Sequence, residues 1–437
     1  MCFFIKENGF FCFLKRLLIR VISRVIAVPI ACGVVLVYPL VQIRLIKLFS
    51  SRIGHYSFNT EAILCALDME LENHVRRKTL FYVLPGEPLC NTQLHYMWKR
   101  TIPILPLSHV AAEVDKLLIH HGGKKYRNDS LKNIFEPSGD GRDKWDLLGR
   151  VKECHLSFTP QEEDDGRVLL KEMGIPEGAP FICLLVRDSA YLNTYMPSTD
   201  WSYHDSRDAD INSYQLAASY LAEKGYYVVR MGKVVKDQFF TNNPKIIDYA
   251  NSKLRTDFMD IYLSANCFFY LTTCSGLDSV ARVFRKPLLV TNLVLQDFDI
   301  WHPWKIFILK KIEDVKNNRI LTFEEMRKLY FEMRRKKEIP QLMKNRGLRY
   351  IDNTPEEIKD AVEEMLESLL GTWISTGEDE KLQKKFWEIF PKYLTGDNNS
   401  QFNIPVCEDI KMRAGTIFLK KNLSLLTDME ISEVTAL

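Results

Sequence analysis

The sequence predicts an α/β protein that contains parallel sheets and more than one domain. Short apolar runs of strand length alternate with helical patterns between Pro180 and Asn292, as in a parallel sheet with crossover helices. Polar clusters follow three of these strands in a row, where ligands bind in open parallel sheets. The 437 residues are 46% hydrophobic and 26% charged, which allows two or three domains with large cores.

The central stretch has four predicted strands and three predicted helices. The strands cover residues 181–186, 226–231, 267–271 and 287–291, and the helices cover 211–224, 258–265 and 277–284. The first strand is uniformly apolar, which is typical of a strand buried on both faces. A dense polar segment follows it directly, from Arg187 to Asp210. We expect the chemical centre of the protein at these strand ends.

Residues 1–60 differ in composition from the rest of the chain. No Asp or Glu occurs between Asn8 and Thr60, and an uncharged run at 25–43 has basic residues on both sides. The run approaches the roughly 20 residues that span a bilayer, although two prolines and a glycine interrupt it. Its length and the lack of a small-residue cleavage site argue against a signal peptide. We predict a membrane anchor that either spans the bilayer or lies in its interface as a kinked basic hairpin; a buried helix is the alternative.

A smaller α/β domain is predicted between the anchor and the central stretch. Its helices are expected at 61–78, 91–98 and 110–121, and its strands at 80–84 and 101–107. Asn91 is the expected cap of the middle helix. Residues 122–150 have the composition of a loop. A further strand is expected at 155–159, followed by a helix from Thr159 to about residue 173.

The alternation of strand and helix signals becomes less regular after Asn292. A strand is expected at 307–312, and helices are expected to begin at Thr322, Thr354 and about residue 379, with a short one at 413–425. The helix after Thr322 becomes strongly basic, which favours a solvated face over a lipid-binding patch. The resulting domain boundaries are 1–55 for the anchor, 56–160 and 161–340 for the two α/β domains, and 341–437 for the C-terminal helices and tail.

Composition excludes several classes of function. The net charge of +3 is too small for a dedicated nucleic-acid binder. The ten cysteines are scattered without C-x-x-C or paired-histidine spacing, which indicates reduced cysteine rather than disulfides or a zinc site. The sequence also lacks the Walker A loop, G-x-G-x-x-G, G-x-S-x-G and H-E-x-x-H.

The break from Thr272 to Gly276 is a candidate anion site. A strand ends there, and a helix is expected to begin at Ser275-Gly276, so that its backbone N–H groups would face a phosphate or diphosphate. Gly276 would allow the ligand to approach closely. An ordinary serine cap at a tight turn is the alternative.

Two arginines end neighbouring predicted strands. Arg187 follows the first strand, and Arg230 ends the second, with Gly232 and Lys233 beside it. Converging guanidinium groups would donate paired hydrogen bonds to phosphate oxygens.

Asp208-Ala209-Asp210 has the D-x-D spacing of some metal-binding sugar transferases. Asp210 stands where a helix begins, however, so helix capping explains this residue and no bound metal is expected.

Other residues could contact a base, a sugar or an acceptor. Tyr191, Trp201, Tyr203 and His204 crowd one loop and could stack on a ring, or could simply pack the loop. Candidates for the general base lie in or after strand ends of the first domain, although each of them taken alone is more often an ordinary surface or core residue. They are His95, His109 and Glu87.

A set of longer motifs is spread over most of residues 60–425. The motifs are Arg187-Asp188-x-x-Tyr191; Asp200-x-Ser202-Tyr203-His204-Asp205-x-Arg207-Asp208-x-Asp210-Ile211; Tyr214; Gly225-Tyr226; Val229-Arg230-Met231-Gly232; Ser275-Gly276; Asn353-Thr354-Pro355-Glu356-Glu357-Ile358; Asn91-Thr92-Gln93-Leu94; and Met97-Trp98-Lys99-Arg100. In these motifs the chain resembles a family of bacterial glycosyltransferases linked to surface polysaccharide synthesis.

The resemblance implies a GT-B-like architecture, in which two Rossmann-like domains face a cleft. The second domain would bind a nucleotide-sugar donor and the first an acceptor. The residues expected to bind the donor are Arg187, Tyr191, His204, Arg207, Arg230, Gly232, Thr272, Ser275 and Gly276. Those expected to be catalytic are Glu87, His95 and Asp188. No cofactor is expected.

The leading hypothesis is a membrane-associated glycosyltransferase with its catalytic part in the cytoplasm. It would move a sugar from a nucleotide-sugar to a glycan or a lipid-linked acceptor, and arginines would neutralise the leaving diphosphate. A GT-B-like nucleotide-sugar epimerase is one alternative, although it would need no anchor. A non-catalytic module that binds nucleotide-sugar or polysaccharide is the other.

Overall fold

The computed structural model describes residues 10–70, 77–121, 143, 146–297, 305–333, 336–390 and 412–426. The chain divides into two compact units. The N-terminal unit comprises residues 1–141 and 154–157, and the C-terminal unit comprises 142–153 and 158–437.

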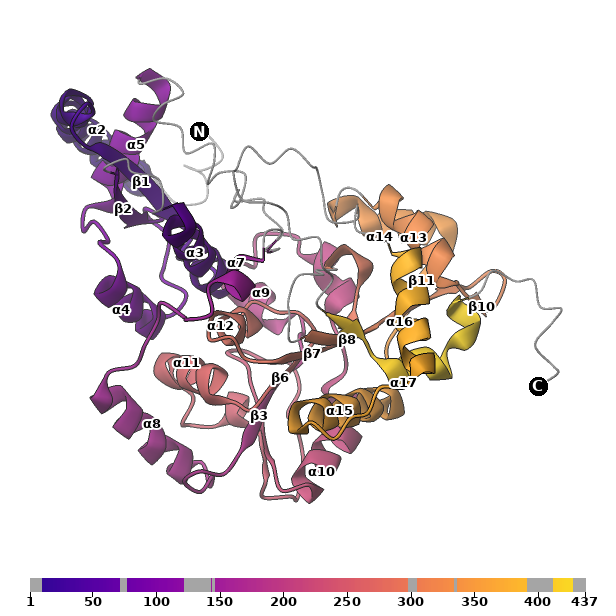
Figure 1. The fold of residues 1–437 in the computed structure, drawn as a ribbon. Coiled ribbons are helices and arrows are strands. Elements are labelled where there is room, and N and C mark those ends of the chain that lie inside the picture. Colours follow the sequence, from indigo (N-terminus) through magenta and orange to yellow (C-terminus); the bar gives the residue numbers. More distant parts are fainter. Residues whose placement is uncertain are drawn as a thin grey trace, which may run out of the picture. The chain divides into compact units, whose positions relative to one another are not determined.

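The C-terminal unit is built on a parallel sheet that has seven strands within the described residues (Figure 1). The strand order is β12-β8-β7-β6-β3-β4-β5. Their bounds are β3 Phe181–Leu185, β4 Tyr227–Arg230, β5 Ile246–Ile247, β6 Tyr270–Thr272, β7 Leu288–Leu293, β8 Lys305–Leu309 and β12 Arg413–Ala414. All four strands predicted in the central stretch are confirmed, and the sheet is parallel as predicted. Every residue of β3 and β7 is buried, as expected when helices cover both faces.

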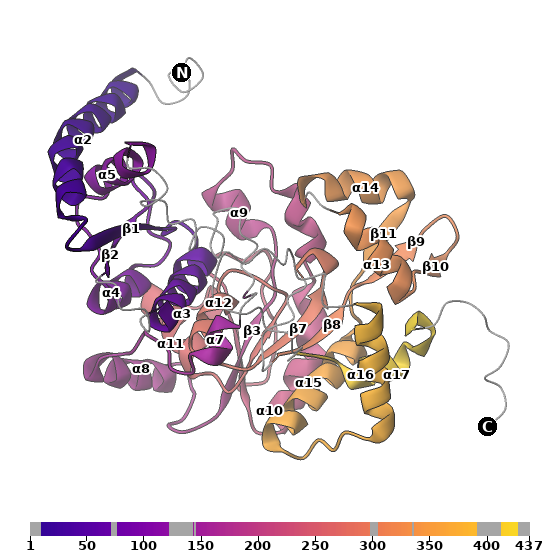
Figure 2. The same ribbon diagram turned by 45° about the horizontal axis from the view of Figure 1, so that its top comes forward.

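The helices lie on both faces of this sheet. α10 (Gln215–Glu223) and α15 (Pro355–Leu370) pack together over β4, β7 and β8, while α12 (Asp278–Val283) packs on β6 and contacts α11 (Asp257–Asn266) (Figure 2). The chain starts in the middle of the sheet at β3, moves outward to β4 and β5, and then returns to β6 on the other side of β3. The direction of winding therefore reverses between β3 and β6. Ligands of open α/β sheets bind beside such a reversal, at the carboxyl ends of the strands.

Shorter elements complete this unit. The helices are α7 Leu147–Arg150, α8 Pro160–Glu172, α9 Ala190–Tyr195, α13 Phe323–Glu332, α14 Ile339–Arg346, α16 Gly377–Ile389 and α17 Thr416–Lys421. The 3₁₀ turns are η3 Ser202–Arg207, η4 Ile211–Tyr214, η5 Tyr249–Asn251, η6 Leu295–Asp297, η7 Lys336–Glu338 and η9 Leu423–Leu426. A small antiparallel sheet consists of β9 Lys311–Asp314, β10 Arg319–Ile320 and β11 Leu348–Ile351.

The predicted helix starts at Thr159, Thr322 and Thr354 are confirmed. In each case the threonine side chain accepts a hydrogen bond from the third residue of the helix, and the Glu at that position bonds back to the threonine N–H. α16 begins in the same way, with Thr376 and Asp379. Each reciprocal pair satisfies two N–H groups that the start of a helix would otherwise leave without partners.

The N-terminal unit contains a parallel pair of strands, β1 (Gln42–Leu48) and β2 (Arg77–Val83), in register from Gln42 with Arg77 to Leu48 with Val83. The sequence analysis missed β1 and placed residues 42–48 with the anchor, because a basic segment next to an apolar run resembles its flank. The other elements are α2 Phe10–Val37, the π-helix η1 His55–Asn59, α3 Thr60–Glu70, α4 Thr92–Thr101 and α5 Ser108–His121. Asn91 caps α4 as predicted, with its side chain accepting from the Leu94 N–H at 2.8 Å.

Three sequence predictions in this region are wrong. The helix predicted at 61–78 ends at Glu70, and β2 begins at Arg77. The strand predicted at 101–107 is a single bridge between Ile104 and Phe81. The strand predicted at 155–159 is irregular. Most of the loop predicted at 122–150 and most of the last 40 residues lie outside the described residues.

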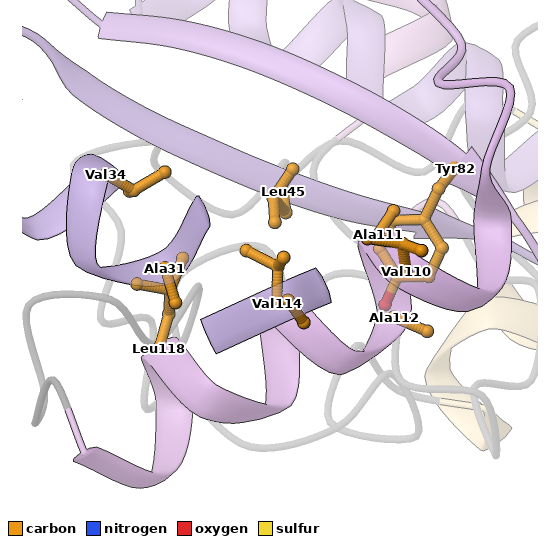
Figure 3. Packing of buried hydrophobic residues seen from close by; sticks show 10 residues of the cluster. Ala31, Val34, Leu45, Tyr82, Val110, Ala111, Ala112, Val114 and Leu118 are labelled. Carbon is orange, nitrogen blue, oxygen red and sulfur yellow. The ribbon is translucent and has the colours of Figure 1, made fainter. Parts of the chain in front are cut away.

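α2 is a long apolar helix with one narrow buried stripe. Ala27, Ala31 and Val34 pack against β1 and α5, where Val114 and Leu118 are buried (Figure 3). Most of the other large apolar side chains of α2 face solvent, including Leu18, Val21, Ile22, Val25 and Leu36. Within the described residues, the segment Leu14–Val37 is the one helix long and apolar enough to cross a membrane. The predicted uncharged run is therefore helical only as far as Val37, and its end enters β1.

Candidate active site

The loops that follow β3 and β6 meet at the reversal of the sheet. The Arg187 N–H, two residues beyond β3, donates to the Thr273 hydroxyl, just beyond β6, at 2.9 Å. The Thr273 N–H in turn donates to the Leu185 carbonyl. The predicted polar clusters after these two strands therefore belong to one site, and the position is the one at which doubly wound sheets bind ligands.

Arg187 is the buried cation of this site. Its guanidinium forms an ion pair with Asp208 and donates to the His204 carbonyl at 3.0 Å. Burial, followed by the charge of Arg207, lowers the pKa of Arg187 to about 10. The guanidinium groups of Arg187 and Arg207 are thus held close together at the carboxyl edge of the sheet. Such an arrangement is unfavourable unless anions lie nearby.

The second cation, Arg207, ends the 3₁₀ turn η3 and is partly exposed. Its Nε pairs with Asp297, and its Nη1 lies 3.3 Å from His204 Nδ1. Burial alone would lower the pKa of Arg207, but electrostatic interactions, chiefly that with the Asp297 carboxylate, outweigh burial and raise it. Arg207 therefore carries a full charge at the surface of the site.

Three aromatic rings lie on the same turn. The rings of Tyr203 and His204 are 4.1 Å apart between centroids, and Trp201 stacks on His204 at 5.9 Å. Tyr203 and His204 are both partly exposed. Tyr191 lies apart from them on α9, where its ring contacts Tyr195 at 4.9 Å. The predicted aromatic cluster thus divides into three neighbouring rings at η3 and Tyr191 on α9.

Both aspartates of the D-x-D tripeptide have protein partners. Asp208 pairs with Arg187. Asp210 accepts from the Asn212 N–H at 2.9 Å, which is the capping role predicted from the sequence.

The segment from Thr272 to Gly276 differs from its prediction. The helix begins at Asp278, not at Ser275, and it is a short six-residue helix. The Asp278 carboxylate accepts from the Thr272 hydroxyl and from the Ser275 N–H, both at 2.8 Å. A carboxylate of the protein therefore occupies the position where the sequence analysis placed a phosphate at the helix start. Ser275 is partly exposed and Gly276 is exposed, so they remain available at the rim of the loop.

Arg230 is also placed differently from its prediction. Its side chain is 1% exposed, and it donates to Asp248 and to the Asp237 carbonyl, both at 3.0 Å. It holds the loop after β4 in place and cannot reach a ligand in this conformation. Gly232 follows with a φ of +153°, and a Cβ there would lie 2.5 Å from Val235, so its role too is to let this loop pack closely.

Asp188 joins the loops after β3 and β4. One of its carboxylate oxygens accepts from the Ala190 N–H and the other from the Lys236 N–H, both at 2.9 Å. This arrangement suits a residue that fixes the loops, because each oxygen already accepts a backbone hydrogen bond.

All three candidates for the general base, His95, His109 and Glu87, belong to the N-terminal unit. His95 lies on α4, where its Nδ1 is 2.6 Å from the hydroxyl of buried Tyr56. Burial and, next, the charge of Lys99 lower the pKa of His95, so the ring is neutral near pH 7. Glu87 is exposed in the loop after β2. His109 approaches this loop, with its Cε1 atom 3.8 Å from the Cβ position of Gly86.

Sequence analysis missed Lys310, which directly follows β8. Its ammonium group donates to the Asp208 carbonyl and pairs with Asp352, both at 2.7 Å, and burial lowers its pKa. Asp208 therefore lies between Arg187 and Lys310. A basic residue directly after an apolar strand is the signal that identified Arg187, and the same signal could have identified Lys310.

Solved structures of two glycosyltransferases and of an epimerase match the chain at low similarity. A glycosyl transferase of family 9 from Veillonella parvula is 11% identical over 76% of this chain and 97% of its own, with a TM-score of 0.40. The ADP-heptose lipopolysaccharide heptosyltransferase II of E. coli is 14% identical over 56% of this chain and 84% of its own, with a TM-score of 0.29. A UDP-N-acetylglucosamine 2-epimerase is 11% identical over 76% of this chain and 97% of its own, with a TM-score of 0.27.

No protein-family profile matches the chain, and no curated protein matches it in sequence. The TM-scores are low, so these structural likenesses carry no argument about activity. The function has to be argued from the residues of the site.

Proposed function

We propose that this protein is a glycosyltransferase that uses a nucleotide-sugar donor. The donor binds at the carboxyl edge of the C-terminal sheet, between β3 and β6. The sugar passes to a glycan or lipid-linked acceptor in surface polysaccharide synthesis, at the cytoplasmic face of a membrane.

The observation that carries the proposal is the pair of joined loops at the reversal of the sheet. The Arg187 N–H to Thr273 bond brings together the polar segments after β3 and β6, and Arg207 and His204 lie on the segment that follows. Cations, aromatic rings and exposed small residues thus gather where a doubly wound sheet binds ligands. A nucleoside diphosphate needs this combination, since it has an anionic centre beside a flat ring.

Each part of the donor has a proposed partner. Arg207 contacts the diphosphate, because it is charged, partly exposed and next to His204. The rim at Ser275 and Gly276 receives a phosphate oxygen or a ribose hydroxyl. Tyr203 and His204 stack on the base or the sugar ring. Arg187 lies behind them and supplies positive potential.

We propose that the leaving diphosphate is stabilised by these cations without a bound metal. Asp208 is committed to Arg187 and Asp210 to the backbone of η4. A magnesium ion prefers several oxygen ligands, and these two carboxylates would have to leave their partners to provide them. Turnover that persists in excess EDTA is the expected result. Activity that falls in EDTA and returns with metal, but not in Asp208→Asn, would refute this part.

Of the three residues expected to be catalytic, Glu87, His95 and Asp188, His95 is the proposed general base. Its lowered pKa leaves it able to accept a proton at neutral pH, whereas both oxygens of Asp188 already accept backbone hydrogen bonds. Glu87 is exposed, so its carboxylate is solvated.

The exposed face of α2 is the proposed membrane contact. Its large apolar side chains cover far more surface than isolated exposed residues do, and such patches mark membrane or protein contacts. The basic residues near its start, such as Lys15, Arg16 and Arg20, suit anionic headgroups. An enzyme held there could reach a lipid-linked acceptor.

A screen of nucleotide-sugars separates this function from its alternatives. A cognate nucleotide-sugar at about 100 times its Kd should stabilise the chain by roughly 2.7 kcal/mol. Slow release of the nucleoside diphosphate without acceptor, accelerated by acceptor, is expected of a transferase. Conversion of the sugar without acceptor would indicate an epimerase instead, and binding without turnover would indicate a binding module. Failure of every nucleotide-sugar to bind would refute the proposal.

A further inference from the structure

A second cluster of chemically reactive side chains lies in the N-terminal unit, apart from the donor site. Glu61, Cys65 and His155 each place one potential ligand atom within 4.8 Å of the others. Glu61 and Cys65 are buried, and His155 is partly buried. None of them belongs to the proposed transfer chemistry.

Helix α3 arranges the acidic and thiol groups on one face. Glu61, Cys65 and Asp68 follow one another at intervals of four and three residues, the spacing that lines up side chains along a helix. His155 approaches this face from a segment far along the chain. The side chain of Glu61 is 0% exposed, and a buried carboxylate is costly unless a positive charge neutralises it.

The three ligand atoms lie within 4.8 Å of one another, close enough for small shifts of the side chains to place them around one metal ion. His155 Nδ1 lies 3.1 Å from Glu61 Oε2, and Cys65 Sγ lies 3.8 Å from Glu61 Oε1. A tetrahedral zinc ion with bonds of about 2.0 to 2.3 Å separates its ligand atoms by roughly 3.3 to 3.8 Å. Thiolate, imidazole and carboxylate are all zinc ligands, and the thiolate disfavours magnesium and calcium.

The remaining nitrogen of His155 has the partner that metal-bound histidines usually have. Nε2 lies 2.9 Å from Asp68 Oδ2. In metal sites a carboxylate at this position fixes the tautomer and the orientation of the ring, leaving the other nitrogen to bind the ion. Asp68 is thus a positioning residue in this arrangement, not a ligand.

We propose that Glu61, Cys65 and His155 bind one Zn²⁺ ion, with Asp68 orienting the imidazole. The sequence argued against a zinc site because the cysteines are scattered without C-x-x-C or paired-histidine spacing. The structure supplies the histidine from 90 positions beyond Cys65. Three protein ligands leave a fourth position for water or another small ligand.

Binding of Zn²⁺ requires two of the ligands to be deprotonated. The Cys65 thiol gives up its proton and becomes a thiolate, and His155 gives up any proton on Nδ1; both go to solvent. Zinc affinity should therefore fall as the pH is lowered, because protons compete for the same atoms.

The test uses cobalt as a spectroscopic substitute for zinc in the full-length chain. After treatment with a chelator, one Co²⁺ per chain should bind with a thiolate-to-cobalt charge-transfer band in the near ultraviolet, and Zn²⁺ should displace it. Cys65→Ser should abolish the band. Cys154→Ser is the matched control, because Cys154 is next to His155 in sequence but lies outside the cluster, and it should retain the band.

Asp68→Asn tests the arrangement without touching a ligand. It should weaken Co²⁺ binding about 10- to 100-fold while leaving the band in place at saturation. An absent charge-transfer band in the wild-type chain would overturn the proposal and leave a metal-free ion pair between His155 and the two carboxylates. A band that survives Cys65→Ser would place the metal elsewhere and would overturn it as well. If Cys65→Ser does not fold, a Zn²⁺-dependent rise in Tm that Asp68→Asn reduces and Cys154→Ser retains still supports the site, and its absence refutes it.

Discussion

At the scale of single residues, much of the conspicuous polar sequence in the C-terminal unit holds the loops in place. Asp278 binds Thr272 and Ser275, Asp188 binds two loop amides, and Arg230 binds Asp248. In the polar segment that follows β3, Arg207 and His204 are partly exposed, and their side chains can bind a diphosphate or stack on a ring. The proposed transferase site needs rigid loops before it can stabilise developing charge.

Arg230→Ala is expected to lower stability without changing donor affinity. Removing the guanidinium leaves the Asp248 carboxylate without its cation and the loop after β4 without its tie to the Asp237 carbonyl. The loss should be about 3 kcal/mol in the free energy of unfolding, measured by urea titration. A folded variant with intact stability and weakened donor binding would instead return Arg230 to the ligand contacts.

Asn353→Ala should also be strongly destabilising. Asn353 and Asn292 exchange side-chain to backbone hydrogen bonds of 2.6 and 2.7 Å, and Asn353 also donates to the Leu309 carbonyl. The pair joins the end of β7 to the start of α15 in a buried position. Each group left without a partner should cost about 1 to 3 kcal/mol. Thermal unfolding of the variant beside Asn345→Ala, an exposed helical asparagine, provides the comparison.

At the scale of elements, helix starts are strongly specified by local sequence. Thr354 begins α15, which packs on α10 and on two strands of the sheet. Thr354→Ala should cost about 1 kcal/mol, whereas Thr354→Ser should cost much less, because serine retains the cap. Chemical denaturation measures both values, and equal losses in the two variants would contradict the capping explanation.

The start of α13 should make stability sensitive to acid. A bidentate hydrogen bond from Arg319, at 2.6 and 2.7 Å, is the main effect that lowers the pKa of Glu325. A carboxylate with a lowered folded pKa contributes stability above its unfolded pKa, near 4.3, and loses it as the pH falls through the folded value. The stability difference between wild type and Glu325→Gln should therefore shrink between about pH 5 and pH 3. A constant difference across this range would contradict the assignment.

The exposed face of α2 should determine membrane binding. Leu18→Glu, Ile22→Glu and Val25→Glu together should release the protein from lipid vesicles, because a charge within the bilayer costs about 2.5 to 3.5 kcal/mol. The same triple substitution at exposed Val168, Leu216 and Leu370 of the C-terminal unit is the matched control. Truncation near residue 52 is a poorer test, since it would also remove β1. Equal vesicle binding by both triple variants would refute the anchor.

At the scale of the whole molecule, the sequence predicts the central strands of the large parallel sheet well, but it does not predict β1 or β12. The four central strands are apolar runs with turn signals on each side, so local pattern suffices to find them. β1 carries Arg44 and Lys47, and β12 is a two-residue strand that pairs with β8 more than 100 residues earlier. Strands of this kind depend on long-range pairing, which local pattern does not reveal.

For the candidate site, the sequence predicts which residues lie at the strand ends but not which partners their side chains contact. Residue type and strand position are enough to place Arg187 and Asp188 beside the loop from Thr272 to Gly276. Whether a cation faces a ligand or a carboxylate of the protein depends on contacts such as that of Arg230 with Asp248, which are distant in sequence. The cluster at Glu61, Cys65 and His155 was missed for the same reason.

Donor titration of Arg207→Ala tests the central claim most directly. Isothermal calorimetry with the cognate nucleoside diphosphate should show a loss of roughly 1.5 to 3 kcal/mol in affinity, because a charge-assisted contact to the diphosphate is removed. Arg349→Ala is the matched control, since Arg349 is an exposed arginine paired with Glu313 on the small antiparallel sheet, and its affinity should equal that of wild type. If the folded Arg207→Ala variant binds as tightly as Arg349→Ala, the donor does not bind at the edge between β3 and β6, and the proposed site is wrong.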